Sequence, residues 1–574
     1  MPRAVPAIIL AVACVTAAHS QVVIVPPGPQ LGSANPITAE PPVSRPPGVP
    51  CTVSLFSDLE FADFNPKTFN YTPPPTCPGP WAKVVFTADF TVTIGNQFDR
   101  TAAFYLGHAN IFYGTTAEPS ASLSPSWHVE RDVTDLTSLL MTAQAGEADL
   151  DNFVGTSGGI VYNGLIYANA ALEFYPLTPG ASTPDTPDVV IPFPDAAGGA
   201  VALDSGSSQL SQSISLPLNT ERVFLDVIAQ SQGDDEFWYT CVPNDVASEL
   251  QSCGNTGFRE TEVSIDNQAA GVAPIYPWIY TGGIDPFLWQ PITGVQTLDF
   301  KPYRVDLTPF AGLLGNGQAH TLAISVYNAN NYFLATANLL VYADHGATQV
   351  TGAVLSNSLT ALPSPVVKEH LTTDSSGNLS GSVVVSSSRR YAISGYVDTS
   401  HGRVETTVDS HVDFKNLQTF VINAASYIQN ITQTSRVDSL TTVNDGSSNH
   451  STRTRLAYPF TFEYSYIVQK NGASDQATSS DQQYLLTVAS SSDRSPTAEA
   501  EVRSEVKSAD VDHFDASGNF MGNSGQTSSA QDLQRNSRGH CFDRSLSAAK
   551  GELTAVTTNW NCGQSPNRRP DLEE

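Results

Sequence analysis

Hydrophobic and polar positions alternate along most of this chain, with a period close to two residues. Runs rich in branched and aromatic residues, such as 81–94 and 101–107, end at turn-forming residues, which is typical of β-strands. A helical spacing of apolar positions occurs only over about 132–140, where it amounts to a turn or two. The pattern therefore predicts an all-β protein.

A repeated order of elements predicts two similar domains. The segment 131–140 (RDVTDLTSLL) precedes a strand-like run that ends at Tyr175, and the segment 304–314 (RVDLTPFAGLL) precedes strand-like runs over 318–327 and 337–342. Each copy has a strand, a turn of the type Asp-Val/Leu-Thr, and a Leu-Leu pair. We expect two tandem antiparallel jelly-roll β-sandwiches, one over 51–205 with a trailing linker and one over 206–346.

The ends of the chain differ from its middle. Residues 1–20 resemble a secretory signal, with Arg3 before an apolar stretch and small residues at the expected cleavage site before Gln21. No later apolar run is long enough to span a membrane. Residues 21–50, rich in proline and glycine, predict an extended linker. Residues 347–574 predict a further β-rich C-terminal region, in which we find no chemical motif, and 563–574 a frayed tail.

Cysteines and sequons agree with export. Six of the seven cysteines remain if Cys14 leaves with the signal, and an even set in an exported chain is typical of disulfides. Six cysteines allow fifteen pairings, of which nearness in the sequence favours the following: Cys51–Cys77, Cys241–Cys253 and Cys541–Cys562. Sequons predict glycosylation at four positions: Asn70, Asn378, Asn430 and Asn449.

Charge and histidine spacing exclude several classes of function. The chain has 56 acidic and 28 basic residues, a formal charge of −28, which argues against nucleic acid and anionic membranes as partners. The histidines are scattered, without an HExxH motif or a close pair suited to zinc. We therefore predict no metal and no cofactor.

Two short motifs resemble hydrolase signatures without their required context. Asp204-Ser-Gly206 resembles the aspartic-protease motif, but such a protease needs two aspartates that share a proton, and no second copy is present. Gly155-Thr-Ser-Gly-Gly159 matches the G-x-S-x-G pattern, which requires a strand-to-helix turn in an α/β sheet. We interpret the first as linker and the second as a turn.

Two carboxylates beside aromatic residues are the best candidates for chemistry. Asp99 and Arg100 follow a strand-like run, and Glu236 lies between two acidic residues and the aromatic run 237–239. A turn or structural role explains each motif when it is taken alone. However, carboxyls in two different environments can divide the roles of acid and base.

Six stretches between Cys51 and about Asp344 carry a family resemblance: Thr116–Pro119, Asn219–Arg222, Asp235–Tyr239, Gly257–Glu260, Ile279–Pro286 and Leu288–Ile292. Through them the region resembles the peptide-N4-(N-acetyl-β-glucosaminyl)asparagine amidase A family of plants and fungi, in a form similar to the fungal members. Shorter stretches around 98–100, 132–134 and 217–222 resemble the bacterial type F amidase, which has two jelly rolls.

The resemblance implies a secreted enzyme that hydrolyses the amide bond between asparagine and the innermost N-acetylglucosamine of N-glycopeptides or glycoproteins. It implies catalytic roles for Asp99 and Glu236, with Phe98 in place of the tryptophan of the bacterial W-D-R motif. A third carboxylate is expected near 150–155, where Asp151 is the acidic residue, or at Glu118. The predicted substrate-binding residues are Arg100, Glu118, Trp238, Tyr239 and Trp289.

Two rival functions remain open at this stage. One is a secreted carbohydrate-binding β-sandwich protein without catalysis, and the other is an aspartic protease that uses Asp204. Deamidation of a glycopeptide would distinguish the enzyme from the binding protein, and cleavage of unglycosylated protein would indicate the protease.

Overall fold

The computed structural model describes residues 28–560 and Cys562, and it confirms the all-β prediction. The described residues form thirty strands, whereas each of their helical segments is only three or four residues long. The predicted signal sequence and the tail 563–574 lie outside the described residues.

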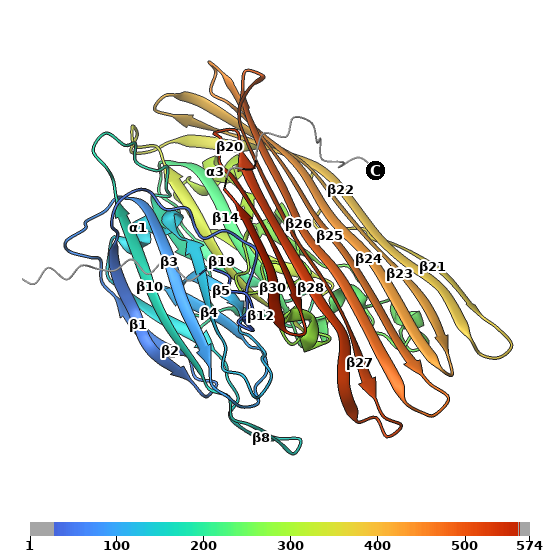
Figure 1. Ribbon diagram of the computed structural model, residues 1–574. Coiled ribbons are helices and arrows are strands. Elements are labelled where there is room, and N and C mark those ends of the chain that lie inside the picture. Colours follow the sequence, from blue (N-terminus) through green and yellow to red (C-terminus); the bar gives the residue numbers. More distant parts are fainter. Residues whose placement is uncertain (1–27, 561, 563–574) are drawn as a thin grey trace, which may run out of the picture.

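The first sandwich consists of two four-stranded antiparallel sheets that share one hydrophobic core. One core group is formed by the rings of Phe86, Phe90, Phe104 and Phe112, which contact one another. A separate hairpin, β8 (Gly155–Ser157) and β9 (Ile160–Tyr162), projects from the sandwich (Figure 1). The strands of the two sheets, in spatial order, are β1 (Cys51–Phe61), β10 (Ile166–Pro176), β3 (Trp81–Val92) and β6 (Ser126–Asp132), and β2 (Lys67–Tyr71), β7 (Gln144–Leu150), β4 (Thr101–Leu106) and β5 (Ala109–Thr115).

The second sandwich also has two sheets, and it begins earlier than predicted. Strands β11 (Val189–Pro192) and β12 (Val201–Leu203) both pair with β19 (Tyr332–Ala343), so these two short edge strands belong to the second sandwich. The segment that contains them was predicted as the trailing linker of the first domain because proline, glycine and alanine dominate it. The remaining strands are β14 (Thr220–Gln232) and β17 (Tyr303–Asp306) in one sheet, and β13 (Leu210–Ile214), β18 (His320–Tyr327), β15 (Glu260–Ile265) and β16 (Gln268–Pro274) in the other.

The repeated Asp-x-Thr motif makes the same local contacts in both sandwiches. Asp132 accepts a hydrogen bond from the backbone N–H of Thr134, at 3.1 Å, and Asp306 accepts one from Thr308, at 3.0 Å. Each threonine hydroxyl in turn contacts the backbone of a neighbouring strand. One turn of helix follows in each copy, α1 (Thr137–Leu140) and α3 (Ala311–Leu314). The repeat is therefore a local capping motif at the end of a strand.

The C-terminal region forms one antiparallel sheet of eleven strands that covers the second sandwich (Figure 1). Phe414 of this sheet contacts Phe258 of the sandwich, with ring centroids 4.8 Å apart, and Tyr458 contacts Tyr276 at the same distance. Arg389 forms buried ion pairs with Glu260. The strands are β20 (Thr351–Asn357), β21 (Val366–Thr373), β22 (Leu379–Thr399), β23 (Gly402–Asn423), β24 (Ser426–Asn444), β25 (Asn449–Val468), β26 (Ser474–Ser492), β27 (Ser495–Phe514), β28 (Phe520–Asn536), β29 (Cys541–Ala549) and β30 (Glu552–Asn559).

The proline-rich segment before Cys51 packs against the rest of the molecule. Arg45 forms ion pairs of 2.8 Å with Glu130 and with Glu173 of the first sandwich, and Gly32 donates a backbone hydrogen bond to Leu553 of the C-terminal sheet. The described part of the predicted linker, 28–50, therefore connects the first sandwich to the C-terminal sheet. Its composition indicated an extended chain but gave no sign of these contacts.

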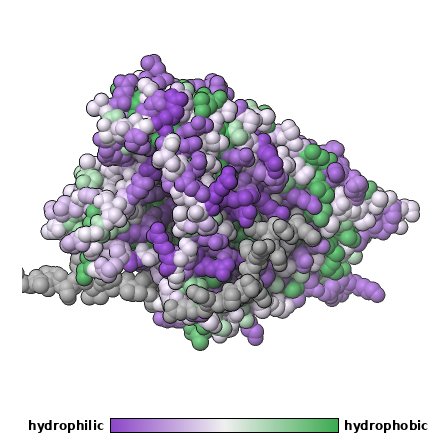
Figure 2. All heavy atoms as spheres, turned by 90° about the horizontal axis from the view of Figure 1, so that it is seen from above, coloured by the Kyte–Doolittle hydropathy of each residue, from purple (hydrophilic) through white to green (hydrophobic). Residues whose placement is uncertain are grey.

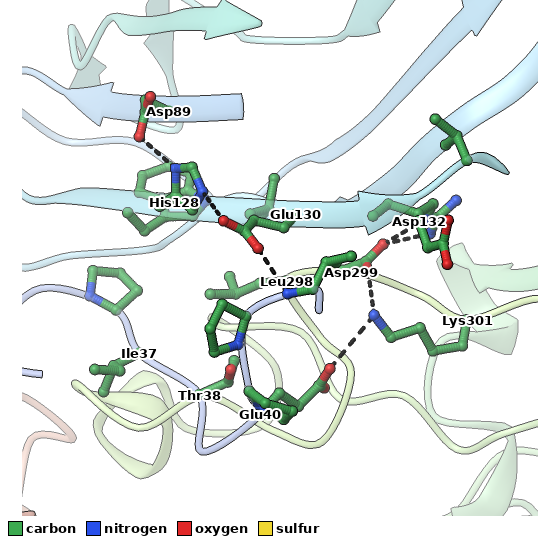
Figure 3. A pocket seen from close by; sticks show the side chains of 18 of the residues that line it. Ile37, Thr38, Glu40, Asp89, His128, Glu130, Asp132, Leu298, Asp299 and Lys301 are labelled. Atoms are coloured by element: carbon green, nitrogen blue, oxygen red, sulfur yellow. Dashed lines mark hydrogen bonds and ion pairs between the residues drawn. The ribbon is translucent and has the colours of Figure 1, made fainter. Parts of the chain in front are cut away.

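A cavity of about 1160 Å³ lies under this segment (Figure 3). Several of its charged side chains are paired with one another, because His128 contacts Asp89 and Glu130, and Lys301 contacts Glu40. Asp99, Glu118 and Glu236 do not line it. We therefore interpret this cavity as a space between packed elements and not as the site of chemistry.

The disulfide pairing predicted from nearness in the sequence is confirmed. The Cα–Cα distances are 6.2 Å for Cys51–Cys77, 4.5 Å for Cys241–Cys253 and 5.7 Å for Cys541–Cys562. The four sequon asparagines are exposed, as glycosylation would require.

The face of the molecule drawn in Figure 2 is polar, and the helical segments are short. The face in Figure 2 is mostly hydrophilic, with hydrophobic residues in small groups. Among the described residues, none of the helices is long and apolar enough to cross a membrane.

Candidate active site

Asp99 lies in the connection between β3 and β4, where the first sandwich meets a loop of the second. Its carboxylate Oδ2 accepts a hydrogen bond of 2.7 Å from the backbone N–H of Gly282. Its own backbone N–H donates to Glu118 Oε2 at 3.0 Å. The structure therefore brings together two of the residues predicted from the sequence, Asp99 and Glu118, around the backbone of Gly282.

Position 282 has no room for a side chain. A Cβ atom there would overlap Glu118 Oε2 and lie 3.2 Å from Asp99 Cγ. Only glycine lets the loop backbone come this close to two carboxylates. Two further bonds fix the loop against the strand that precedes Glu118: Thr281 Oγ1 donates to Thr116 O at 2.7 Å, and Gln290 Nε2 donates to Glu118 O at 2.9 Å.

Arg100 and Phe98 lie on either side of Asp99 in the sequence and contact each other. The Arg100 guanidinium lies 4.8 Å from the centre of the Phe98 ring, and this ring stacks on Tyr162 of β9 at 4.4 Å. Arg100 Nη1 donates to the Asp99 carbonyl at 3.0 Å, while Arg100 Nε is buried and has no hydrogen-bond partner among the described residues. Phe98 keeps 39% of its surface exposed. A charged group and an aromatic face are thus present beside the carboxylates.

Glu236 follows β14 in a loop that is held by its neighbour Asp235. The Asp235 carboxylate is completely buried, forms an ion pair of 2.8 Å with Arg259, and accepts the backbone N–H groups of Asn330 and Asn331, each at 2.8 Å. Breaking a buried pair of this kind costs about 3–5 kcal/mol. The two adjacent acids therefore have different tasks: Asp235 anchors the loop, whereas the half-buried Glu236 has no anchoring role of this kind.

The three carboxyls influence one another electrostatically. Burial, together with the charges of Asp99 and Glu118, raises the pKa of Glu236 to about 7. Burial and the charge of Asp99 raise the pKa of Glu118 to about 7 as well. Burial also raises the pKa of Asp99, but the Gly282 N–H and the Arg100 charge oppose that rise. Asp99 and Glu118 each accept a backbone N–H and feel the charge of Arg100, both of which favour the ionised form, whereas the causes acting on Glu236 all favour its protonated form.

The three aromatic residues expected to contact the substrate are part of the core. Trp238 and Tyr239 have 0% exposure and pack against Phe414 and Phe460 of the C-terminal sheet. Trp289 is also buried, and its Nε1 donates to Gly283 O at 2.9 Å. A ring without exposed surface cannot contact a substrate, so the structure does not support the predicted substrate-binding role of these three residues. Their packing instead fixes the loops that carry Glu236 and Gly282.

The two hydrolase-like motifs behave as turns. Gly155–Gly159 forms the hairpin of β8 and β9, as predicted. Asp204 is exposed and follows the short strand β12. Asp151 lies near enough to Arg100 for their charges to interact, although its side chain is exposed.

Several residues that build this site were absent from the sequence-based prediction. Gly282, Asp235 and Arg259 all lie within stretches that carried the family resemblance, but no spacing rule indicates that distant segments meet at them. The pair Gly282-Gly283 was a usable signal, because glycine is frequent where a backbone must approach closely.

Comparison with known proteins gives the family. Residues 36–359 match the model of the family described as peptide N-acetyl-beta-D-glucosaminyl asparaginase amidase A. The chain belongs to this family. The match includes Asp99, Glu118, Glu236 and Gly282, and it ends at the beginning of the C-terminal sheet.

A curated relative and two solved structures resemble this family member. The chain is 29% identical over 453 residues, 75% of this chain and 77% of the relative, to peptide-N4-(N-acetyl-beta-glucosaminyl)asparagine amidase A of Prunus dulcis. It is similar to the structure of PNGase F, a glycosylasparaginase from Flavobacterium meningosepticum, with 15% identity, 52% of this chain and 96% of that chain covered, and a TM-score of 0.35. It is also similar to PNGF-II, with 12% identity, coverage of 52% and 65%, and a TM-score of 0.35.

Proposed function

We propose that this protein is a glycoamidase that hydrolyses the bond between asparagine and the innermost N-acetylglucosamine of N-glycopeptides or glycoproteins. Membership of the amidase A family supports this activity, as does the almond relative that carries its name. The strongest structural support is the group of three carboxyls, Asp99, Glu118 and Glu236, whose charges influence one another.

The reaction requires a base, an acid and an orienting group. Water adds to the side-chain carbonyl carbon of asparagine and loses a proton, the carbon–nitrogen bond breaks, and the departing nitrogen gains a proton. The products are a peptide with aspartate at that position and a glycosylamine, which then loses ammonia in water. Carboxyl groups alone can perform these proton transfers.

In our proposal, Asp99 holds or activates the water and Glu236 supplies the proton or polarises the carbonyl. Asp99 suits the ionised role because the Gly282 N–H and Arg100 favour its charged form. Glu236 suits the protonated role because its raised pKa, about 7, keeps the proton in mildly acidic solution. Glu118 connects the two by its hydrogen bond to the Asp99 backbone and its charge.

Substrate contact is proposed for Arg100 and Phe98. The buried Arg100 Nε atom has no partner in the part of the chain that the structure describes and is available to donate a hydrogen bond, and the exposed Phe98 ring offers an apolar face. We thus assign to Phe98 the aromatic contact with substrate that the sequence had suggested for Trp238, Tyr239 and Trp289.

The rival functions have less support. A protein that only binds carbohydrate does not need three carboxyls whose pKa values are raised by burial, two of them also by the charge of a neighbouring carboxylate. An aspartic protease needs a buried pair of aspartates, whereas Asp204 is exposed. We further propose that the chain is exported, as its first twenty residues and its three disulfides suggest.

The direct test is incubation of the purified protein with a defined N-glycopeptide in ¹⁸O-labelled water. We expect mass spectrometry to find aspartate in place of the glycosylated asparagine, with one ¹⁸O atom in its carboxyl group. An intact glycopeptide, or a peptide that keeps one N-acetylglucosamine on asparagine, would refute the proposed reaction.

A further inference from the structure

Three buried aspartates meet where the Gly282 loop packs on the C-terminal sheet. Asp285 belongs to this loop, and Asp510 and Asp512 are on β27. One carboxylate oxygen from each residue lies within 4.8 Å of the others. Their exposures are 2%, 2% and 8%, respectively.

Their charges have little compensation from the described residues. No lysine, arginine or histidine among those residues forms an ion pair with any of the three, although the charge of the nearby His513 acts on Asp510 and Asp512. Within the described part of the chain, Asp285 Oδ2, Asp510 Oδ2 and Asp512 Oδ1 are each buried without a hydrogen-bond partner. The donors that reach the other oxygens are neutral: the Phe287 N–H bonds to Asp285 Oδ1, and Asn523 Nδ2 bonds to Asp510 Oδ1. Several buried carboxylates without counter-charge are unstable unless they bind protons or a cation.

We propose that Asp285, Asp510 and Asp512 bind a hard divalent cation, preferably Ca²⁺. The ligand atoms are all carboxylate oxygens, which is the donor set that Ca²⁺ prefers and that zinc or copper does not select. His513 is next to Asp512, but its ring nitrogens already contact Asp475 and Ser524, at 2.7 and 2.8 Å. Water can supply the remaining ligands that Ca²⁺ requires.

The cation would join the active-site loop to the C-terminal sheet. Asp285 is three residues from Gly282, whose N–H bonds to Asp99, and it caps the short helix η4 (Pro286–Trp289). The neighbouring contacts serve the same junction: Gln526 Nε2 donates to Phe287 O at 2.6 Å, and the rings of Phe287 and Phe520 stack at 5.8 Å. This consequence for catalysis rests on the proposed function, whereas the binding of the cation does not.

The alternative is that the three carboxyls stay neutral by binding protons. Burial and mutual repulsion raise the pKa of Asp285 to about 7 and that of Asp512 to about 6. A bound cation and bound protons would each offset the buried negative charge, so only a measurement of cation binding separates these two explanations.

The test is calorimetric titration of the full-length, chelator-treated protein with CaCl₂ at pH 7.5, together with thermal unfolding in CaCl₂ and in EDTA. We expect one Ca²⁺ per chain, a dissociation constant of about 10⁻³ M or tighter, and an unfolding temperature higher in CaCl₂ than in EDTA by at least about 2 °C. The double variant Asp510→Asn/Asp512→Asn should lose both responses.

Two controls keep the result interpretable. Asp409→Asn removes an exposed carboxylate from the same sheet and should leave Ca²⁺ binding unchanged. If the double variant does not fold, Asp512→Asn alone should weaken Ca²⁺ binding at least tenfold. No heat of binding and no shift in the wild type, or the same response in Asp512→Asn as in the wild type, would overturn the proposal. Because binding is measured without substrate, its failure is distinguishable from failure of the glycoamidase assay.

Discussion

Replacing Gly282 with alanine tests the geometry of the carboxyl group without changing any catalytic side chain. The added methyl group would overlap Glu118 Oε2 and approach Asp99 Cγ to 3.2 Å. The end of the Glu118 side chain is the part that can move, and it must move by about 1.5 Å to reach van der Waals distance. Its bond to the Asp99 N–H, now 3.0 Å, would then be lost.

The expected loss of activity follows from that displacement. A misplacement of about 1 Å in a positioned group costs on the order of 10²-fold in rate. A lost hydrogen bond to a charged group costs about 1.5–3 kcal/mol of folding free energy, which is small for a chain with several cores. We therefore expect kcat/KM of Gly282→Ala on a glycopeptide to fall roughly a hundredfold, with a cooperative thermal transition still present.

Two further variants make the experiment decisive. Gly283→Ala is the matched control, because its Cβ would lie no closer than 3.1 Å to any neighbour, so its effect should be much smaller. Combining Gly282→Ala with Glu118→Ala removes the overlapping oxygen, and the combined loss should be less than the product of the two single losses. Full activity of Gly282→Ala, or simple multiplication of the two losses, would refute the close approach of Gly282 to Glu118.

The other predictions concern the acid and the supporting sheet. Because Glu236 is protonated below about pH 7 and ionised above it, wild-type kcat/KM should fall as pH rises through this value. Glu236→Gln should be roughly a hundredfold slower and its kcat/KM should no longer fall in this pH range. If the variant keeps the fall at the same pH, the titration belongs to another group. Asn416 is buried and donates to Tyr239 O at 2.9 Å, so Asn416→Leu should lower the free energy of unfolding by about 1–3 kcal/mol in denaturant unfolding. Thr419→Ala, a change at an exposed position of the same strand, should leave that free energy unchanged. Equal effects of the two variants would contradict the supporting role of the sheet.

Local signals predicted much of the fold. Alternating apolar residues indicated strands such as β3, the Asp-x-Thr motif indicated the repeated turn, and the nearness of cysteines indicated the disulfides. Each of these features depends on residues close together in the sequence. The start of the second sandwich was missed because the edge strands β11 and β12 are short and rich in residues typical of linkers.

The environment of the site depended on contacts across long sequence distances. The sequence does not distinguish Asp235 from its neighbour Glu236. The structure does, because the buried Arg259 forms an ion pair with Asp235, which anchors the loop, and leaves Glu236 as the candidate acid. Trp238 was expected to bind the substrate, but it is buried against Phe414 of the C-terminal sheet. Asn416 points to the core although alternation normally places an apolar residue there, because it bonds to the loop behind Glu236.

The turnover of Asp99→Asn on a defined N-glycopeptide decides whether this group of carboxyls is catalytic. The change keeps the size of the side chain but removes its negative charge and its basicity. We expect deglycosylation to be abolished while thermal unfolding is nearly unchanged, and we expect Asp204→Asn, in an exposed turn, to have wild-type activity. Full activity of Asp99→Asn would contradict the assignment of catalysis to this group of carboxyls.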